Sequence, residues 1–322
     1  TILEVKDLSV TFTQYDRGFS RRTIHAVEKM DLEIKSGEIV AVVGSSGSGK
    51  SLLAHAIMGI LPYNSEMDGE IRFLGEPLTE KKIKRLRGHE IVLVPQSVSY
   101  LDPLMKIGDQ IQNGKKDVSV KEKCLAVLKR YGLAPDIRGK YPFQLSGGMT
   151  RRVLISTAVM EKPKLVIADE PTPGLHLEAA TRVMGHFREM ADDGAGVLLI
   201  THDLGVVASM CDKIAVMYAG KVIEYGTTDD IFYRPSHEYT KGLLRSIPRL
   251  DEKEKTRLVP IEGSPVDMLN PPAGCPFAPR CESCMKICLK QMPEYTDLSD
   301  IHYSACWLLQ KEEFLKAQGG DK

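Results

Sequence analysis

The 322-residue sequence has no apolar stretch long enough to cross a bilayer, which takes about 20 residues in a helix. Its apolar runs, such as residues 39–43, are short and end at a glycine or a charged residue. The opening residues, TILEVKDLSV, have none of the features of a secretory signal. We therefore expect a protein of the cytoplasm, or one attached peripherally to the cytoplasmic face of the cell membrane.

The sequence also lacks a charge imbalance, since lysine plus arginine and aspartate plus glutamate number 43 each. This balance gives no electrostatic reason to expect nucleic acid or anionic lipid as the main partner. Cysteine is scarce over most of the chain, because only Cys124 and Cys211 precede residue 270. Cytoplasmic thiols stay reduced, so we expect the cysteines that cluster after residue 270 to bind a metal and not to form disulfides.

The hydrophobic pattern predicts an α/β fold. Residues 2–12 alternate apolar and polar side chains like a half-buried strand, and a polar segment, 14–26, is interpreted as a hairpin tip before a second such strand. The next run, 39–44, is wholly apolar, which is typical of a strand buried on both faces of a parallel sheet. Helical periodicity, as in 119–133, separates it from later apolar runs at 164–170, 196–203 and 213–220.

The segment GSSGSGKS, residues 44–51, matches the phosphate-binding loop pattern G-x4-G-K-[S/T]. An apolar strand precedes it, and a helix that we expect to end at Pro62 follows it. Backbone N–H groups of such a loop surround phosphate oxygens, the lysine reaches the β- and γ-phosphates, and the next hydroxyl binds Mg²⁺. We expect nucleotide contacts along this loop and at the position after it: Gly44, Ser45, Ser46, Gly47, Ser48, Gly49, Lys50, Ser51 and Leu52.

An acidic pair, Asp169 and Glu170, ends another apolar strand. An acid at a strand end beside the phosphate loop suits Mg²⁺, which assigns Asp169, and Glu170 is then placed to act as general base toward the attacking water. Upstream, LSGGM at residues 145–149 opens a helix. Taken alone, its Ser146 is equally well an ordinary helix N-cap.

In this order and spacing, the motifs resemble those of the nucleotide-binding subunit of an ABC transporter. They are the phosphate loop, VPQ (94–96), LSGGM (145–149), VIADE (166–170) and LITHD (199–203), within a similarity that covers residues 2–240. The segment HEYTKGLLRSIP (237–248) and the cysteine-rich tail after it resemble the ATPase subunits of dipeptide and oligopeptide importers. Nickel importers share much of this pattern. The resemblance implies a P-loop NTPase core with an antiparallel β subdomain and an inserted helical subdomain.

The resemblance also implies roles for individual residues. The catalytic residues would be Glu170, His202, Gln96 and Lys50. Gln96 would sense Mg²⁺ and the attacking water, and His202 would hold the γ-phosphate and orient Glu170. Phe12 would stack on adenine, although it equally fits a core position of an alternating strand.

A dimer follows from the same resemblance, since Ser146, Gly147 and Gly148 would contact ATP bound to the opposite subunit. The chain departs from the family pattern at His176, where the family usually has aspartate, and at residues 150–152, which read Thr-Arg-Arg. One hypothesis is that the partner's site, completed by His176 and this signature, works differently from the site built on Glu170. Tolerated sequence drift is the alternative.

The cysteine cluster has the spacing C-x5-C-x2-C-x3-C-x17-C. A helix over residues 281–292 would place its three cysteines on one face, and four thiolates suit zinc or an iron–sulfur cluster. Spacing does not separate the two metals, and buried thiols without a ligand are a further alternative. The resemblance implies a [4Fe–4S] cluster, with an extra thiol that could replace a ligand and with His302 as a loop residue. The implied ligands are Cys275, Cys281, Cys288 and Cys306, and Cys284 is the extra cysteine.

We expect an ATPase domain at residues 1–248, with its helical subdomain at 97–160, a linker at 249–272 and a cysteine-rich region at 273–322. The resemblance implies ATP- and Mg²⁺-dependent import of di- or oligopeptides. The implied partners are a second ATPase subunit, two membrane permeases and, indirectly, an external binding protein. Import of nickel or another metal complex, or a soluble ATPase outside transport, are the alternatives, because this chain does not select the cargo.

Overall fold

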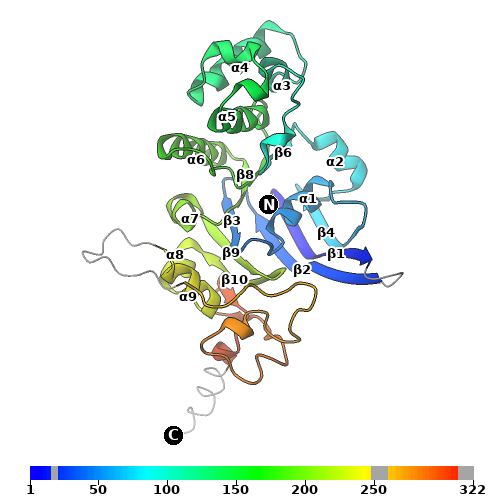
Figure 1. The fold of residues 1–322 in the computed structure, drawn as a ribbon, viewed down its shortest axis with the longest axis vertical. Helices are drawn as coiled ribbons and strands as arrows, with labels where there is room; N and C mark the ends of the chain where they lie inside the picture. Colours follow the sequence, from blue (N-terminus) through cyan, green and yellow to red (C-terminus); the bar gives the residue numbers. More distant parts are fainter. Residues whose placement is uncertain (16–20, 248–259, 311–322) are drawn as a thin grey trace, which may run out of the picture.

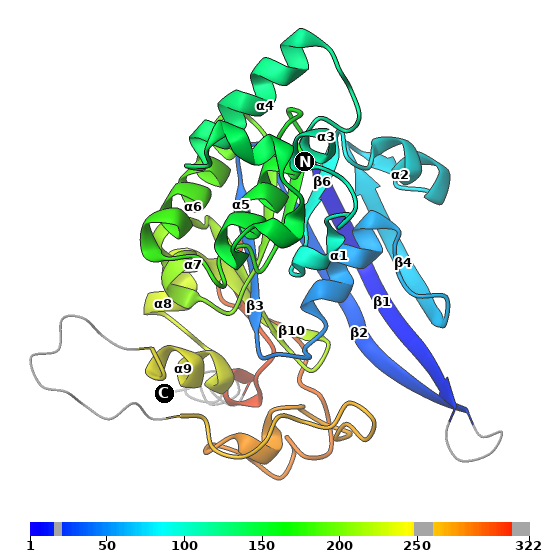
Figure 2. The same cartoon turned by 45° about the horizontal axis from the view of Figure 1, so that its top comes forward.

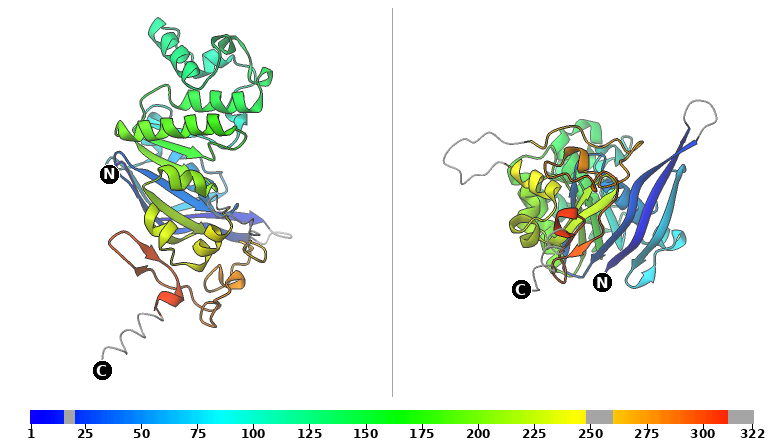
Figure 3. Two further views of the ribbon diagram at one scale, coloured as in Figure 1. Left: turned by 90° about the vertical axis from the view of Figure 1, so that its left-hand side faces the viewer. Right: turned by 90° about the horizontal axis from the view of Figure 1, so that it is seen from below.

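The structure, a computed structural model, describes residues 1–15, 21–247 and 260–310 (Figure 1). Two β-sheets form its centre, a group of helices lies at one end, and the C-terminal region lies at the opposite end (Figures 1 and 3). Within the described ranges no helix is both long and apolar enough to cross a membrane. The architecture confirms the predicted α/β fold with an additional antiparallel sheet.

The antiparallel sheet begins with the long pair β1 (Leu3–Tyr15) and β2 (Arg21–Ile34). The hairpin tip expected at residues 14–26 is wrong at both ends, because β1 continues to Tyr15 and β2 begins at Arg21; residues 16–20 lie outside the described residues. Strand β1 also pairs with β4 (Ser65–Phe73), which continues into β5 (Glu76–Pro77). Figure 2 shows β1, β2 and β4 as one layer beside the larger sheet. One face of this layer is apolar and buried, as the alternating sequence pattern predicts.

The larger sheet is mixed, and its central strands β9, β3, β8, β7 and β6 are parallel. Every residue of β3, β7 and β8 is buried, because helices pack on one face of the parallel part, while α1 and the antiparallel sheet pack on the other. Strands β10 and β12 extend the sheet in antiparallel fashion toward the C-terminus. In spatial order the strands are β11 (Thr296–Asp297), β12 (Tyr303–Ser304), β10 (Lys221–Thr227), β9 (Lys213–Tyr218), β3 (Ile39–Gly44), β8 (Gly196–Ile200), β7 (Leu165–Asp169) and β6 (Ile91–Val94).

The helix after β3 is shorter than predicted, since α1 ends at Met58 and not at Pro62. Gly59 follows it with φ 60°, a left-handed conformation that ends helices and that glycine adopts most readily. Helices α3, α4 and α5 form the predicted helical subdomain at the top of Figure 1. In chain order the α-helices are α1 (Lys50–Met58), α2 (Glu80–Leu86), α3 (Ile107–Ile111), α4 (Val118–Arg130), α5 (Gly147–Ala158), α6 (Leu177–Asp192), α7 (Leu204–Met210), α8 (Thr228–Tyr233) and α9 (Glu238–Arg245).

The predicted helix over residues 281–292 is wrong. This segment forms successive tight turns, in which the N–H of Cys284 donates to the carbonyl of Cys281 and the N–H of Cys288 to that of Met285. The N–H of Cys275 donates to the carbonyl of Cys288 at 2.8 Å, so the chain must fold back on itself here. That long-range contact replaces the i to i−4 hydrogen bonds of a helix, and the three cysteines do not share a helix face.

The C-terminal region is attached to the mixed sheet through a buried polar contact. His302 lies in the loop before β12, and its Nε2 is 2.9 Å from Oε1 of Glu224 on β10. Glu224 is fully buried and also accepts hydrogen bonds from the backbone N–H groups of Ser236 and His237. Three segments therefore meet on one carboxylate, and His302 serves attachment.

His237 generates a prediction about pH dependence. It caps α9 by accepting a hydrogen bond from the N–H of Tyr239 at 3.0 Å, and burial lowers the pKa of His237 from 6.5 to about 4. The unfolded chain takes up this proton near pH 6.5 and the folded chain does not, so this contribution to stability is present above pH 6.5 and falls as the pH drops toward 4. Asparagine can still cap the helix but does not titrate. We therefore expect the unfolding free energy of the parent to fall by about 2 kcal/mol more between pH 7 and 5 than that of His237→Asn.

Urea unfolding at both pH values measures this difference. His25→Asn, at an exposed histidine of β2, is the matched control and should keep the parent's dependence on pH. Equal pH dependence in the parent and His237→Asn would show that His237 does not cause the effect.

Candidate functional site

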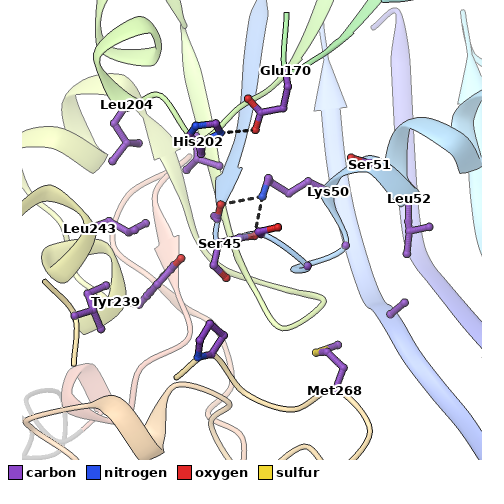
Figure 4. A pocket seen from close by; sticks show the side chains of 18 of the residues that line it. Ser45, Lys50, Ser51, Leu52, Glu170, His202, Leu204, Tyr239, Leu243 and Met268 are labelled. Carbon is purple, nitrogen blue, oxygen red and sulfur yellow. Dashed lines mark hydrogen bonds and ion pairs between the residues drawn. The ribbon is translucent and has the colours of Figure 1, made fainter. Parts of the chain in front are cut away.

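The phosphate loop connects β3 to α1 and lies against two neighbouring strands (Figure 4). Gly44 has φ 153°, and a Cβ there would lie 2.1 Å from the carbonyl oxygen of Met217 on β9. Gly49 has φ 94°, and a Cβ there would lie 2.4 Å from the carbonyl oxygen of Ala26 on β2. Only glycine fits at both positions, so the close packing of the loop against β9 and β2 requires the two glycines of the G-x4-G pattern.

Lys50 is buried inside the loop with its ammonium group turned inward. Its Nζ donates to the carbonyl oxygens of Gly44 and Ser45, both at 2.8 Å (Figure 4). Burial lowers the pKa of Lys50, while the carboxylates of Glu170 and Asp169 act in the opposite direction. The cation is therefore held between the loop carbonyls and two acids, where a phosphate oxygen is a stronger acceptor.

Asp169 ends β7 next to the loop and is 4% exposed. Its Oδ1 has no hydrogen-bond partner among the described residues, and burial raises the pKa of Asp169, opposed by a hydrogen bond from Ser51. A buried carboxylate oxygen without a partner, beside a serine hydroxyl, is the hard-oxygen donor set that Mg²⁺ prefers. The residues present therefore fit the predicted Mg²⁺ site.

Glu170 has a left-handed backbone, with φ 47°, which is rare for a residue that is not glycine. Its N–H donates to the carbonyl of Ile200 at 2.8 Å, and this contact with β8 holds the unusual conformation. Its Oε1 lies 2.7 Å from Nδ1 of His202 (Figure 4), and Oε2 accepts a 3.3 Å hydrogen bond from Thr201. The structure thus brings together the predicted base and the predicted histidine, and strain of this kind is typical of functional positions.

Most of the predicted residues line one cavity of about 900 Å³. Ser48 is buried below it, and its hydroxyl lacks a partner within the described chain. Phe12 is not among the lining residues, because its side chain packs against the core of the antiparallel sheet, whereas its cross-strand neighbour Ile24 lines the cavity. The predicted residues on the cavity wall are Gly44, Ser45, Ser46, Gly47, Gly49, Lys50, Ser51, Leu52, Gln96, Asp169, Glu170 and His202.

The signature residues lie outside this cavity. Ser146 stands at the N-cap position of α5, but its side chain makes no capping hydrogen bond. Ser146 and Gly147 are exposed, so the N-terminal amides of α5 face solvent. Ser146 is thus the N-cap residue of α5 by position, as the ordinary interpretation predicts, but its hydroxyl does not cap the helix and is accessible to a ligand.

His176 occupies the N-cap position of α6, where its Nδ1 accepts a 3.3 Å hydrogen bond from the N–H of Ala179. An aspartate at this position would accept the same bond, so His176 preserves the cap while it removes a negative charge.

Arg151 is a residue that the motif analysis recorded without assigning it a role. Its guanidinium group is buried and donates to the backbone carbonyls of Pro171 at 3.3 Å and Pro95 at 3.0 Å. It also donates to the carbonyls of Gln96 and Glu170. Arg151 thus connects the signature helix to the segments that carry Gln96 and Glu170. Its position in the helix predicted after LSGGM gave no sign of these long-range contacts.

The C-terminal part of the chain supplies the remaining wall of the cavity. The segment interpreted as a linker has neither helix nor strand in its described part, residues 260–272, yet it packs against the site. Its charges, prolines and glycines are typical of a linker, so this contact could not be predicted from the sequence. The lining residues from this part of the chain are Tyr239, Leu243, Ser246, Pro260, Ile261, Pro265, Met268 and Arg280.

Four cysteines line a second, small cavity in the C-terminal region: Cys275, Cys281, Cys288 and Cys306. Cys284 is exposed and does not line it. Burial raises the pKa of Cys275 to about 11 and that of Cys281 to about 12, and neighbouring thiols add to both effects. Within the described ranges, no three or more His, Cys, Asp and Glu side chains are grouped so that they could hold a metal ion.

Two family profiles match separate parts of this chain. The family profile described as ABC transporter matches residues 27–173, and the one described as oligopeptide/dipeptide transporter, C-terminal region, matches residues 223–288. The chain is 41% identical to the dipeptide transport ATP-binding protein DppD of Bacillus subtilis, over 99% of this chain and 98% of that protein. It is 39% identical to the oligopeptide transport ATP-binding protein OppD of Salmonella typhimurium, over 91% and 89% respectively.

Solved structures agree with these sequence relatives. A dimeric ATP-binding cassette in a post-hydrolysis state, bound to ADP and Pi, superposes with a TM-score of 0.61 at 27% identity. It covers 70% of this chain and 99% of its own, so the remainder of this chain extends beyond the cassette.

The buried contacts of Arg151 predict a large effect on stability. Arg151→Met keeps the length of the side chain but leaves carbonyl groups in the interior without donors, each at a cost of about 1–3 kcal/mol. We expect the free energy of unfolding, measured with urea, to fall by about 2–4 kcal/mol. Arg182→Met is the matched control, because this arginine of α6 is partly exposed in a surface ion pair with Glu178. A loss no larger than that of Arg182→Met would contradict the structural role of Arg151.

Proposed function

The chain belongs to the ATP-binding proteins of dipeptide and oligopeptide ABC transporters, and from this premise we propose that it hydrolyses ATP to drive peptide import. The observation that carries the proposal is the convergence of Lys50, Asp169, Glu170 and His202 on one cavity. These four residues come from three separate segments and supply a cation, a Mg²⁺ ligand, a base and a group that orients the base.

In the proposed reaction, Glu170 accepts the proton of a water molecule while the oxygen of that water attacks the γ-phosphorus and the bond to the β-phosphate oxygen breaks. His202 holds Oε1 of Glu170 and so directs the carboxylate. Lys50 moves from the loop carbonyls to phosphate oxygens and neutralises their charge. Asp169 and Ser51 would hold Mg²⁺, which, when bound, neutralises charge on the phosphates.

We further propose that two ATPase subunits enclose the nucleotides. The exposed Ser146 and Gly147 and the half-buried Gly148 support this arrangement, because all three lie outside their own cavity. Hydrolysis would then require closure, since the second set of phosphate contacts comes from the partner. His176 at the α6 N-cap removes a carboxylate from the predicted interface loop, which supports unequal activity of the two sites.

The helical subdomain offers a surface for membrane permeases. A group of large apolar side chains is exposed there, which is unusual for a surface without a partner. We propose that this surface attaches the chain peripherally to the cytoplasmic face of the membrane. The group comprises Val98, Tyr100, Leu104, Met105 and Phe143. Peptide is the proposed cargo because the relatives described above are named for dipeptide and oligopeptide transport, and a nickel complex is the second candidate.

The four cysteines of the small cavity are the proposed ligands of a [4Fe–4S] cluster. Their shared cavity supports this, and the exposed Cys284 stands apart from it. Four cysteine thiolates are the ligand set of a [4Fe–4S] cluster. These thiols would hold the C-terminal region, residues 273–322, as a unit beyond the ATPase domain of residues 1–248.

Replacement of the proposed base tests the reaction. Glu170→Gln keeps the shape of the side chain but cannot accept a proton, so we expect hydrolysis to fall at least about 100-fold while ATP binding persists. Phosphate release from the chain assembled with its membrane partners measures the rate. Glu178→Gln, at an exposed carboxylate of α6, is the control and should keep the parent rate. More than a tenth of the parent rate in Glu170→Gln would rule out this role.

The cluster is tested by a pair of cysteine substitutions. Anaerobically purified Cys281→Ser should lose iron, sulfide and the broad absorbance near ~400 nm, whereas Cys284→Ser should retain all three. The two positions are close in sequence and differ in burial, so the comparison controls for the substitution itself. A colourless parent protein with one zinc per chain would overturn the assignment.

A further inference from the structure

Residues 260–268, which we call the strap, run across one side of the nucleotide cavity. Pro260, Ile261, Pro265 and Met268 of the strap line the cavity together with the phosphate loop. Figure 4 shows Met268 facing the cavity on the side away from Glu170 and His202. The strap lies outside the matched ABC transporter region, residues 27–173, so the cassette alone does not supply this wall.

Arg280 clamps the first half of the strap. Its Nε donates to the carbonyl of Glu262 at 2.8 Å, and its Nη2 donates to the carbonyl of Ile261 at 2.9 Å. Its Nη1 lies 3.4 Å from the hydroxyl of Tyr218, at the end of β9. All three acceptors are uncharged oxygens, so the geometry of the planar guanidinium group, and not an ion pair, sets the position of the strap relative to the sheet.

Asp267 stabilises a turn at the end of the second half of the strap. Its carboxylate accepts hydrogen bonds from the N–H of Leu269 at 2.9 Å and from the side-chain amide of Asn270 at 3.0 Å. These two donors, followed by the nearby charge of Arg22 on β2, lower the pKa of Asp267. Beyond the Arg280 clamp, Met268 of the strap lines the same cavity as Ile24 and Ala26 of β2.

Helix α9 completes this side of the cavity with Tyr239 and Leu243. The ring of Tyr239 is 1% exposed and packs against Tyr218 and Phe277, with centroid distances of 4.6 and 5.3 Å. Its hydroxyl is directed toward Ser45 of the phosphate loop (Figure 4). Burial raises the pKa of Tyr239, and the contact with Ser45 opposes this effect. Tyr239 therefore joins this side of the cavity to the phosphate loop.

The lining changes in character along the cavity. Near α1 it consists of loop backbone, Lys50 and acids, which suit phosphates and Mg²⁺. At the strap it is mostly apolar, with side chains from β2, α9 and the strap on facing sides, which suits a flat heterocycle. A methionine there adds polarisable sulfur, which contacts aromatic rings favourably. These apolar residues are Ile24, Ala26, Leu243, Ile261, Pro265 and Met268.

We propose that the strap forms the base-side wall of the nucleotide site and that Arg280 is the positioning residue that holds it there. The inference rests on the proposed ATPase function and assigns the base of ATP to a segment outside the ATP-binding cassette. The strap thereby adds contacts with the base, so the site binds a nucleoside triphosphate more tightly than inorganic triphosphate.

Two substitutions separate the base side from the phosphate side. In the full-length chain, Met268→Ala and Arg280→Met should weaken ATP binding about tenfold, as measured by calorimetry. Both variants should bind inorganic triphosphate within about twofold of the parent, because the phosphate loop is unchanged. Leu269→Ala and Arg245→Met are matched controls, since both side chains are exposed and neither lines the cavity, and both should bind ATP like the parent.

The outcomes distinguish the strap from the proposed function. ATP binding within about twofold of the parent in both Met268→Ala and Arg280→Met overturns the strap but leaves the ATPase assignment intact. Equal losses for ATP and inorganic triphosphate also overturn it, because the effect would then lie in the phosphate loop. A parent chain that binds neither ATP nor inorganic triphosphate contradicts the proposed function itself.

Discussion

The close approach of the phosphate loop to β9 and β2 is the contact on which the rest of the site depends. The backbone carbonyls of Met217 and Ala26 occupy the space that side chains at Gly44 and Gly49 would need. The turn after β9 reinforces this contact, since the N–H of Gly220 donates to the carbonyl of Ser48 at 3.1 Å. The loop is thus fixed between the parallel and antiparallel sheets, and its N–H groups are oriented before any ligand binds.

Arg151 extends this fixed geometry to the helical subdomain. It begins on the signature helix α5 and reaches the backbone beside both Gln96 and Glu170. A rotation of the subdomain would therefore pull on the segments that carry two predicted catalytic residues. The same contact can transmit a change in the nucleotide cavity outward to the apolar surface of the subdomain, because the interior is densely packed and buried hydrogen bonds resist breaking.

The features predicted correctly from the sequence are those encoded by neighbouring residues. The phosphate loop, the buried strands and the helical subdomain follow from local pattern, and the cavity then joins Lys50, Asp169, Glu170 and His202. The errors arise where distant contacts override local pattern. The helix over 281–292 is replaced by turns because Cys275 pairs with Cys288 across thirteen residues, and residues 260–268 pack on the site although their composition resembles a linker.

The C-terminal region is mechanically part of the nucleotide site and not an appendage to it. Arg280, which holds the strap, precedes Cys281 by one peptide bond, and Cys281 lines the cysteine cavity. Phe277 lines that same cavity and packs on Tyr239, whose hydroxyl faces the phosphate loop. Two separate routes of direct contact thus join the thiols to the nucleotide cavity. Because each route is short and well packed, we expect a rearrangement of the thiols to change the wall of the cavity that the strap forms.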